Sequence, residues 1–277
     1  MKSAAFSDKI ETAVEHKELT LEGCAIHYFV SGDKANDLLV FLHPAFADHR
    51  CFEKQIDFFS GKFRVIAMDL LGHGLSRAGK AKDKIDASLL HIEAIIKTEG
   101  YERAHFIGVS MGTLIAQYFA LFHPDRVLSM TILGGYDINA DNKEIAKAQR
   151  AEGLKWMVKA IFSMESFRKY VASVSVLRRE EQARFHEMAR SFTRKSFLVM
   201  SGLGKVLQIR EGCKRDYPLL ILCGDSDIEL SRRMSERWHR SQPGSKFCLI
   251  SEAGHCANMD NPGAFNETVM AFIEGNS

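Results

Sequence analysis

Short, continuously apolar segments alternate with amphipathic segments along most of this 277-residue chain, and this alternation restricts the possible fold most. Continuous apolar runs are typical of strands buried on both faces, and the segments between them have apolar residues at helical spacing. Alternating strands and helices predict a doubly wound, mainly parallel sheet of the α/β class. The expected strands read DLLVFLH, FRVIAMDL, RAHFIGV, VLSMTILGG, YPLLILCG and SKFCLIS.

One segment interrupts the alternation. Between residues 137 and 212, amphipathic helical patterns follow one another without a strand. We interpret residues 137–212 as a helical cap inserted into a core made of residues 1–136 and 213–277. The cap has three apolar stripes, which we expect to pack between cap and core: Leu154, Met157, Val158, Ile161 and Phe162; Phe167, Tyr170, Val171 and Val174; Phe185, Met188, Ala189 and Phe192.

The charge of the chain is nearly balanced, with a formal net charge of +2. No basic run of the kind that follows a phosphate backbone is present, so nucleic-acid binding is not expected. Residues 137–212 nevertheless hold 15 Lys and Arg residues against 9 Asp and Glu residues. We interpret this excess as a solvated helical surface, and attraction of an anionic substrate is the alternative.

Targeting segments, cysteine spacing and cofactor motifs bear on where the protein is located and what it binds. The first 16 residues lack the continuous apolar segment of a signal peptide, and no stretch approaches the ~18 apolar residues of a membrane span. We expect a cytoplasmic monomer or homodimer without stable membrane insertion. The six cysteines form no CxxC pair and no metal-ligand spacing, which favours free thiols and no bound metal. No phosphate-binding GxGxxG pattern is present, so no cofactor is expected.

A serine lies between two glycines at one predicted strand-to-helix junction, in the segment Gly108-Val109-Ser110-Met111-Gly112. This GxSxG pattern is that of a nucleophile elbow, a turn so tight that larger side chains at the glycine positions would collide with neighbouring elements. The helix that begins at Met111 would direct its free amide groups and its dipole towards a developing oxyanion. The pattern predicts Ser110 as a nucleophile.

A serine nucleophile needs a base, because its hydroxyl is too weak an acid to ionise near neutral pH. Histidine is the usual base, since its pKa is about 6.5. His255, in the segment SEAGHCANMDNP, follows a predicted strand and precedes the last predicted helix. This position is a loop at the carboxyl edge of the sheet, where ligands of such sheets bind. We predict that His255 is the base.

The histidine in turn needs a carboxylate that orients the imidazole and stabilises its protonated form. The segment LLILCGDSDIE offers Asp225 and Asp227 in the loop after a strongly apolar strand. The GxxD spacing from Gly224 gives the chain room to turn back towards the histidine loop. This favours Asp227, and we expect Asp225 to form the turn. Asp137, just after the preceding strand, is the alternative acid.

An oxyanion hole requires a second amide besides that of Met111. In the segment FLHPAFADHRCF, a predicted strand ends at His43 and a loop begins at Pro44. Because Pro44 has no N–H, we expect the N–H of Ala45 to be the donor, with that of Phe46 as the alternative. The side chain of Phe46 either lines an acyl pocket or covers the core.

Together these segments resemble the α/β-hydrolase superfamily over nearly the whole chain. The matching segments, in order, are His43-Pro44, DLLGHGLS at 69–76, Gly108 to Gly112, GDSD ending at Asp227, and GH at His255. The order Ser110, Asp227, His255 is the one described for α/β-hydrolases. The resemblance implies a structural role for DLLGHGLS. Pro44 departs from the family, which usually has glycine after the histidine.

The serine at the elbow narrows the chemistry that the resemblance implies. Relatives that dehalogenate alkyl halides or open epoxides have aspartate there, whereas Ser110 is similar to esterases, lactonases, thioesterases and carbon–carbon bond hydrolases. We predict a hydrolase of a carboxylic ester, lactone or thioester whose small-molecule substrate is small to medium in size and partly hydrophobic. One alternative is a carbon–carbon bond hydrolase of a vinylogous diketone acid, for which a cap arginine would bind the carboxylate. The other is a ligand-binding receptor with little turnover.

Overall fold

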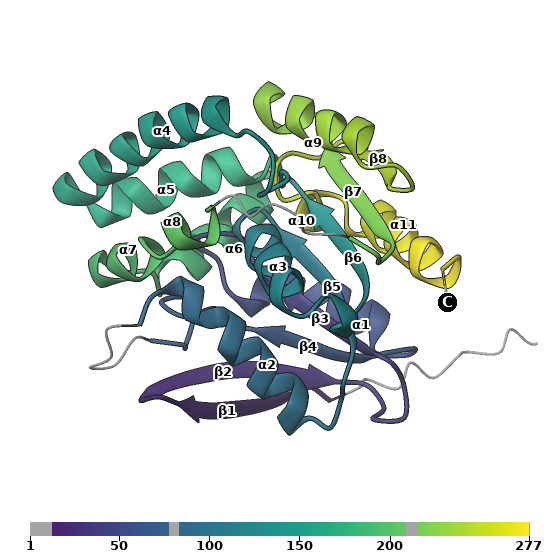
Figure 1. Ribbon diagram of the computed structural model, residues 1–277. Coiled ribbons are helices and arrows are strands. Elements are labelled where there is room, and N and C mark those ends of the chain that lie inside the picture. The colour runs from purple at the N-terminus through teal and green to yellow at the C-terminus, as the bar shows by residue number, and fades with distance from the viewer. Residues whose placement is uncertain (1–12, 78–82, 209–214, 277) are drawn as a thin grey trace, which may run out of the picture.

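An eight-stranded sheet forms the centre of the computed structural model, which describes residues 13–77, 83–208 and 215–276 (Figure 1). The strand order is β1-β2-β4-β3-β5-β6-β7-β8. β2 pairs antiparallel with β1 and β4, and the other pairs are parallel. The strands are β1 (Glu15–Leu21), β2 (Cys24–Ser31), β3 (Leu38–Leu42), β4 (Arg64–Met68), β5 (Ala104–Val109), β6 (Val127–Leu133), β7 (Leu219–Gly224) and β8 (Lys246–Ile250).

Helices cover both faces of this sheet (Figure 1). The α-helices of the described residues are α1 (Glu53–Phe59), α2 (Ser88–Thr98), α3 (Met111–Phe122), α4 (Lys143–Phe162), α5 (Met164–Ser175), α6 (Arg179–Ala189), α7 (Arg194–Met200), α8 (Leu203–Val206), α9 (Glu229–Ser241), α10 (Ala257–Asp260) and α11 (Pro262–Glu274).

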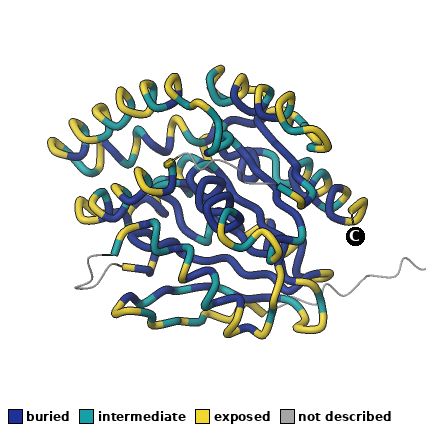
Figure 2. The backbone as a smooth tube through the Cα atoms, in the orientation of Figure 1, coloured by how far each residue is buried: buried dark blue, intermediate teal, exposed yellow. Residues whose placement is uncertain are grey.

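Alternate strand residues enter two separate hydrophobic cores, because successive side chains of a strand point to opposite faces. In β3, Val40 and Leu42 belong to the core that α2, α3 and α9 share, whereas Leu39 and Phe41 belong to the core that α1 and α11 share. The central strands are buried on both faces (Figure 2). The predicted doubly wound, mainly parallel α/β sheet is confirmed.

The helices α4 to α8 follow the carboxyl end of β6 and precede β7, so the expected insertion of helices into the α/β core is present (Figure 1). The boundaries 137–212 stay a prediction, because residues 209–214 lie outside the described part of the chain. Within that part, no helix is both long and apolar enough to cross a membrane.

The third cap stripe packs as predicted, the second does so except for Val174, and the first does not. Residues of the second and third stripes, such as Phe167, Phe185 and Phe192, are buried in the core shared with α1 and α11. The first stripe, on α4, faces solvent (Figure 2), so the expectation that it packs against the core is wrong. Helical periodicity defines a face but not its neighbour. α4 turns Trp156 and Ala160 towards the core instead.

Candidate active site

Ser110 stands at the sharp turn between β5 and α3. Its backbone has φ of +50° and ψ of −112°, a conformation that residues other than glycine seldom adopt. The N–H of Ser110 donates to the carbonyl of Leu133 at the end of β6, over 2.8 Å. This bond ties the strained turn to the neighbouring strand, and it places Ser110 at the carboxyl edge of the sheet.

The two glycines of the elbow are required by close approach of neighbouring backbone. A Cβ atom on Gly112 would lie 1.9 Å from the carbonyl oxygen of Leu42 in β3. One on Gly108 would lie 2.7 Å from the Cα of Thr113 in α3. Both distances are far below van der Waals contact, so α3 reaches β3 and β5 this closely only because both side chains are absent.

His255 and Asp227 form a hydrogen-bonded pair from two neighbouring loops. His255 lies in the loop after β8, and Asp227 lies in the turn after β7. The Nδ1 of His255 is 3.1 Å from each carboxylate oxygen of Asp227. The carboxylate is fully buried, whereas the imidazole side chain keeps 22% of its exposure. The imidazole is therefore held from one side and remains accessible from the other.

Three further donors hold the carboxylate of Asp227, one of them the thiol of Cys223, whose Sγ lies 3.5 Å from Oδ2. The hydroxyl of Ser231 donates to Oδ2 over 2.6 Å, and the N–H of Ile228 donates to Oδ1 over 2.7 Å. Ser231 lies in the first turn of α9, four residues after Asp227. The sequence analysis did not identify Ser231. The signal was present, since a serine four residues after the acid lies one helical turn away from it.

The pair shifts the pKa values of both members. Burial by itself lowers the pKa of His255, but the charge of Asp227 and their hydrogen bond outweigh burial, so this pKa lies above its ordinary value. Burial raises the pKa of Asp227, but the imidazole and the Ser231 hydroxyl, together with the amide of Ile228, hold it below its ordinary value. Asp227 is therefore ionised near neutral pH and makes His255 a stronger base.

The loop after β6 connects the serine turn with the imidazole. Leu133 accepts the hydrogen bond from Ser110, and the next residue, Gly134, passes the imidazole closely. A Cβ atom on Gly134 would lie 2.9 Å from Cε1 of His255. The carboxyl ends of β5 to β8 thus bring Ser110, Asp227 and His255 to the same edge of the sheet. Their catalytic roles stay predictions.

His43 orders the loop that carries the expected oxyanion donor. The N–H of Leu70 donates to its Nε2 over 2.9 Å, so Nδ1 carries the proton and donates to the carbonyl of Pro44 over 2.8 Å. Burial lowers the pKa of His43, which keeps the imidazole neutral. Among the described residues, none accepts a hydrogen bond from the N–H of Ala45. Met111 begins α3, so its N–H precedes the intrahelical bonds.

Phe46 joins this loop to the cap. Its φ of +72° is unusual for a bulky residue. Its ring is buried and meets the rings of Trp156, Phe167 and Phe192 edge-on, with centroids 5.0, 5.1 and 4.9 Å away. Phe46 therefore fills space between core and cap beside Ala45. The sequence analysis named Phe167 and Phe192 only as members of apolar stripes and did not name Trp156.

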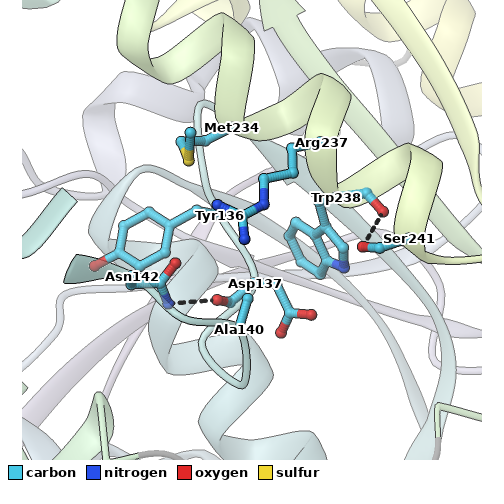
Figure 3. A pocket seen from close by; sticks show the side chains of 8 residues that line it. All are labelled: Tyr136, Asp137, Ala140, Asn142, Met234, Arg237, Trp238 and Ser241. Atoms are coloured by element: carbon cyan, nitrogen blue, oxygen red, sulfur yellow. Dashed lines mark hydrogen bonds between the residues drawn. The ribbon is translucent and has the colours of Figure 1, made fainter. Parts of the chain in front are cut away.

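Asp137, the alternative acid, is engaged elsewhere. The guanidinium of Arg215 pairs with both of its carboxylate oxygens, one of them at 3.0 Å. Its carbonyl accepts a hydrogen bond from the side chain of Asn142 over 2.7 Å. Figure 3 shows Asp137 in a small hollow next to α9. The imidazole of His255 is therefore hydrogen-bonded to Asp227 and not to Asp137.

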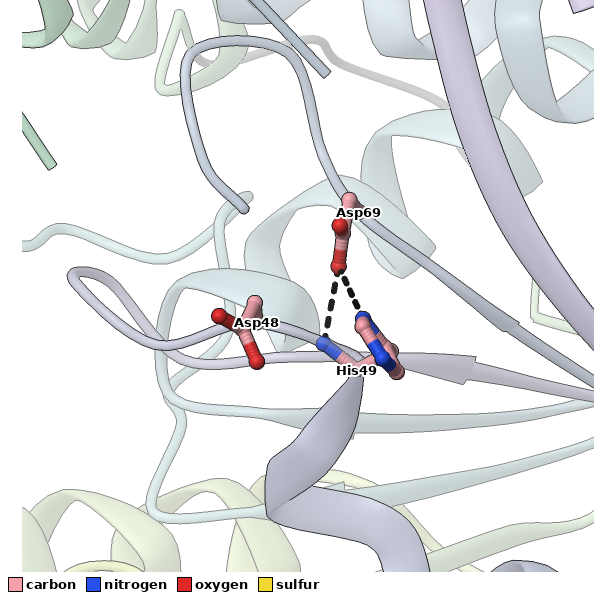
Figure 4. Close-up of side chains that lie close together, drawn as sticks. All are labelled: Asp48, His49 and Asp69. Carbon is pink, nitrogen blue, oxygen red and sulfur yellow. Dashed lines mark hydrogen bonds and ion pairs between the residues drawn. The ribbon is translucent and has the colours of Figure 1, made fainter. Parts of the chain in front are cut away.

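Asp48, His49 and Asp69 are close enough to hold a metal ion in principle (Figure 4). Both oxygens of Asp48 accept hydrogen bonds from the guanidinium of Arg50, over 2.9 and 2.7 Å. Asp69 accepts from the amide and the ring of His49 and from the amide of Leu75. Because a cation already neutralises Asp48 and N–H groups surround Asp69, these residues fit a hydrogen-bonded turn better than a metal site.

Comparisons with known proteins agree with this geometry. The sequence pattern of a family described as alpha/beta hydrolase fold matches residues 37–262. An (E)-2-((N-methylformamido)methylene)succinate hydrolase of Acinetobacter baylyi is 25% identical, with 90% of this chain and 94% of that protein covered. A 2-hydroxy-6-oxononadienedioate/2-hydroxy-6-oxononatrienedioate hydrolase of Burkholderia vietnamiensis is also 25% identical, with 90% of each protein covered. Other curated relatives are named epoxide hydrolases and an enol-lactonase.

Solved structures show the same architecture. A carboxylesterase of Bacillus subtilis superposes with a TM-score of 0.75 at 18% identity, over 96% of this chain and 94% of that one. At this level of identity the match establishes the shared fold alone.

Proposed function

The chain belongs to the α/β-hydrolase family and is a hydrolase, and on that premise we propose that it cleaves carboxylic esters, lactones or thioesters through an acyl-enzyme on Ser110. The observation that carries the proposal is the hydrogen-bonded pair of Asp227 and His255 at the same sheet edge as a serine in a strained turn. The aromatic rings around Phe46 favour a small to medium substrate with a hydrophobic acyl part.

The proposed reaction gives each of these groups one step. The Oγ of Ser110 attacks the carbonyl carbon while the Nε2 of His255 takes the hydroxyl proton. The carbonyl electron pair moves to oxygen, where the amides of Ala45 and Met111 stabilise the negative charge. Collapse of this intermediate breaks the bond to the leaving alcohol, which receives the proton from His255. Water, deprotonated by His255, then releases the acid and restores Ser110.

The elbow residue supports acyl transfer rather than epoxide opening. Some relatives are named epoxide hydrolases, and the resemblance places aspartate at the elbow of such enzymes. An aspartate that opens an epoxide forms an alkyl ester, which water can hydrolyse, whereas a serine would form an ether, which water does not cleave. Attack on an acyl carbon instead gives serine an ester that water can release. Here Ser110 holds that position and His255 supplies the base.

Three of the seven arginines in the described part of the cap are engaged within the fold, whereas others, such as Arg150 and Arg179, are exposed. Cleavage of a carbon–carbon bond in a vinylogous diketone acid would require an arginine free to bind the substrate carboxylate. The three engaged arginines donate to groups of the fold. Arg168 donates to the carbonyls of Ala189, Arg190 and Phe192, Arg194 to those of Ala160 and Ile161, and Arg184 to the carboxylates of Glu181 and Glu53.

Steady-state hydrolysis of p-nitrophenyl esters of graded acyl length tests the proposal, with Ser110→Ala as the key variant. We expect wild-type turnover with a preference for apolar acyl chains, and a loss of roughly 10⁶-fold in kcat for Ser110→Ala. Ser201→Ala is the matched control, because its hydroxyl donates only to the carbonyl of Leu198 in the cap. A fluorophosphonate should label wild type and Ser201→Ala but not Ser110→Ala.

Other results would identify the alternatives. Labelling of Ser110 without multiple turnovers would favour a receptor. Turnover of a vinylogous diketone acid that greatly exceeds turnover of every ester would favour a carbon–carbon bond hydrolase. Substantial ester turnover by Ser110→Ala would overturn the covalent mechanism.

A further inference from the structure

The second half of α4 exposes an uncovered apolar stripe. Its residues recur at intervals of three and four and therefore share one side of the helix. Their exposed fractions run from 45% for Val158 to 86% for Phe162. Figure 2 shows this outer side of α4 as exposed along its length. The members of the stripe are Leu154, Met157, Val158, Ile161 and Phe162.

A neighbouring helix extends this surface. Arg194, at the start of α7, donates to the carbonyls of Ala160 and Ile161, so α7 begins beside the end of α4. Leu198, one turn further along α7, is 71% exposed. Monomeric proteins seldom leave contiguous large apolar side chains in water. We call the stripe together with Leu198 the α4 surface.

Positive charge surrounds the α4 surface. α4 and α7 together carry seven Lys and Arg residues against two Glu residues. Lys147 and Arg150 lie seven and four residues before Leu154, so they continue the apolar stripe towards the start of the helix. Lys147, Arg150 and Lys195 are exposed. The α4 surface is thus apolar at its centre and basic at its margin.

This pattern favours one kind of occupant. A second copy of the chain carries the same basic margin and therefore cannot neutralise it across a two-fold interface. An anionic lipid surface accepts the apolar side chains into its acyl boundary and attracts the basic margin. We propose that the α4 surface docks this protein onto an anionic lipid–water interface. No helix of the described residues spans a membrane, so the attachment is peripheral.

The opposite side of α4 connects this surface to the candidate active site. Trp156 lies within the apolar half of the helix and packs edge-on against Phe46, 5.0 Å between centroids. Phe46 follows Ala45 in the expected oxyanion loop. Docking therefore brings the acyl side of the site next to a lipid phase, which is where partly hydrophobic esters concentrate. The docking itself does not depend on the proposed function.

Co-sedimentation with vesicles tests the proposal directly. The full-length chain carrying Ser110→Ala is used, so that no lipid is consumed and the outcome is independent of catalysis. Vesicles consist of phosphatidylcholine alone or of phosphatidylcholine mixed with phosphatidylglycerol. We expect binding to the mixed vesicles that weakens with added salt, because exposed charges are screened.

Two added variants make the test specific to the α4 surface. Ile161→Ser with Phe162→Ser should lower the partition coefficient on mixed vesicles at least ~10-fold, because both side chains would leave the acyl boundary. Phe122→Ser, at the end of α3 and 52% exposed, is the matched control and should bind as the parent does. Circular dichroism checks that all variants fold.

Three outcomes would overturn the proposal. The first is absence of binding to the mixed vesicles by a folded parent protein. The second is equal binding by the parent and the Ile161→Ser, Phe162→Ser variant. The third is a concentration-dependent dimer in light scattering that this variant abolishes while vesicles leave the parent unbound, since the occupant would then be a second copy.

Discussion

The carboxyl edge of the sheet buries a charged side chain, whereas the second half of α4 exposes apolar side chains to water. At the edge, the carboxylate of Asp227 is fully buried and held by four donors, and Ser110 has a strained backbone. On α4, large apolar side chains such as Phe162 lie in water. At the edge, neighbouring loops bury Asp227 and leave the imidazole of His255 partly exposed, whereas α4 has neighbours on one side only. We expect substitutions at the edge to change chemistry and substitutions within α4 to change stability or surface binding.

Asp227→Asn should have the largest effect of the substitutions that keep both Ser110 and His255. We expect kcat to fall by roughly 10⁴-fold, because the amide cannot stabilise the imidazolium or fix its tautomer. His255 must be neutral to act as a base, so activity rises with pH through its pKa. Removing the carboxylate that raises this pKa, while burial still lowers it, should move the acid limb of the pH–rate profile to lower pH. Ester hydrolysis across pH measures both effects.

Asp225→Asn is the control for this prediction. Its exposed carboxylate accepts hydrogen bonds from the amides of Glu252 and Ala253 and does not contact His255. The acid limb should therefore stay where it is in wild type. An unchanged limb in Asp227→Asn would contradict the assignment of the raised pKa to this pair.

Gly134→Ala should lower kcat by about 100-fold, because the new methyl group would lie 2.9 Å from Cε1 of His255 and displace the imidazole. Gly244→Ala is the matched control. Gly244 has φ of +85°, against +63° for Gly134, but a Cβ there meets no atom within 4 Å. Both variants carry backbone strain, so both should lose stability by about 1 kcal/mol or more. Equal kcat values would show that Gly134 acts through the backbone alone.

Ser231→Ala should lower kcat by roughly tenfold, since the buried carboxylate of Asp227 loses a charge-assisted donor worth about 1.5 kcal/mol. Ser231→Thr keeps the hydroxyl and should restore most of this loss. A structural defect would instead lower the melting temperature of both variants together with their activity. Recovery of kcat by threonine at unchanged melting temperature is the result that supports a positioning role for the hydroxyl.

The meeting of Ser110, Asp227 and His255 at one edge of the sheet could be predicted because each loop directly follows its strand in the sequence. Ser110, Asp227 and His255 each come just after a predicted strand or at its helix junction, and parallel strands end at one edge. The periodicity that predicted the sheet therefore also predicted where these loops meet. Ser231 was missed because a helix residue carries no motif of its own, although its spacing from the acid was visible.

The cap could be predicted only in part, because no sheet fixes the position of its helices. The second and third apolar stripes are buried, as Phe167 and Phe185 show, except for Val174 at the end of the second, which is 46% exposed. The first stripe was assigned to the core because it has the correct period, yet the structure turns Trp156 inward in its place. Both sides of this half of α4 are apolar, so composition could not decide which one packs. The contact with Phe46, more than a hundred residues away in the sequence, decided it.

Gly153→Ala should have the smallest effect and tests the cap side of the comparison. Gly153 lies inside α4, and a Cβ there meets no atom within 4 Å. Alanine should raise the free energy of unfolding by up to about 1 kcal/mol through helix propensity, with unchanged kcat. Urea unfolding measures this gain. A loss of stability would mean that α4 approaches a neighbour on the side of Gly153, and a loss of kcat would mean that α4 transmits changes to Phe46. The first result would contradict a helix with neighbours on one side only, and the second would contradict the expectation that substitutions within α4 leave the chemistry at the sheet edge unchanged. A gain in stability with unchanged kcat would support both.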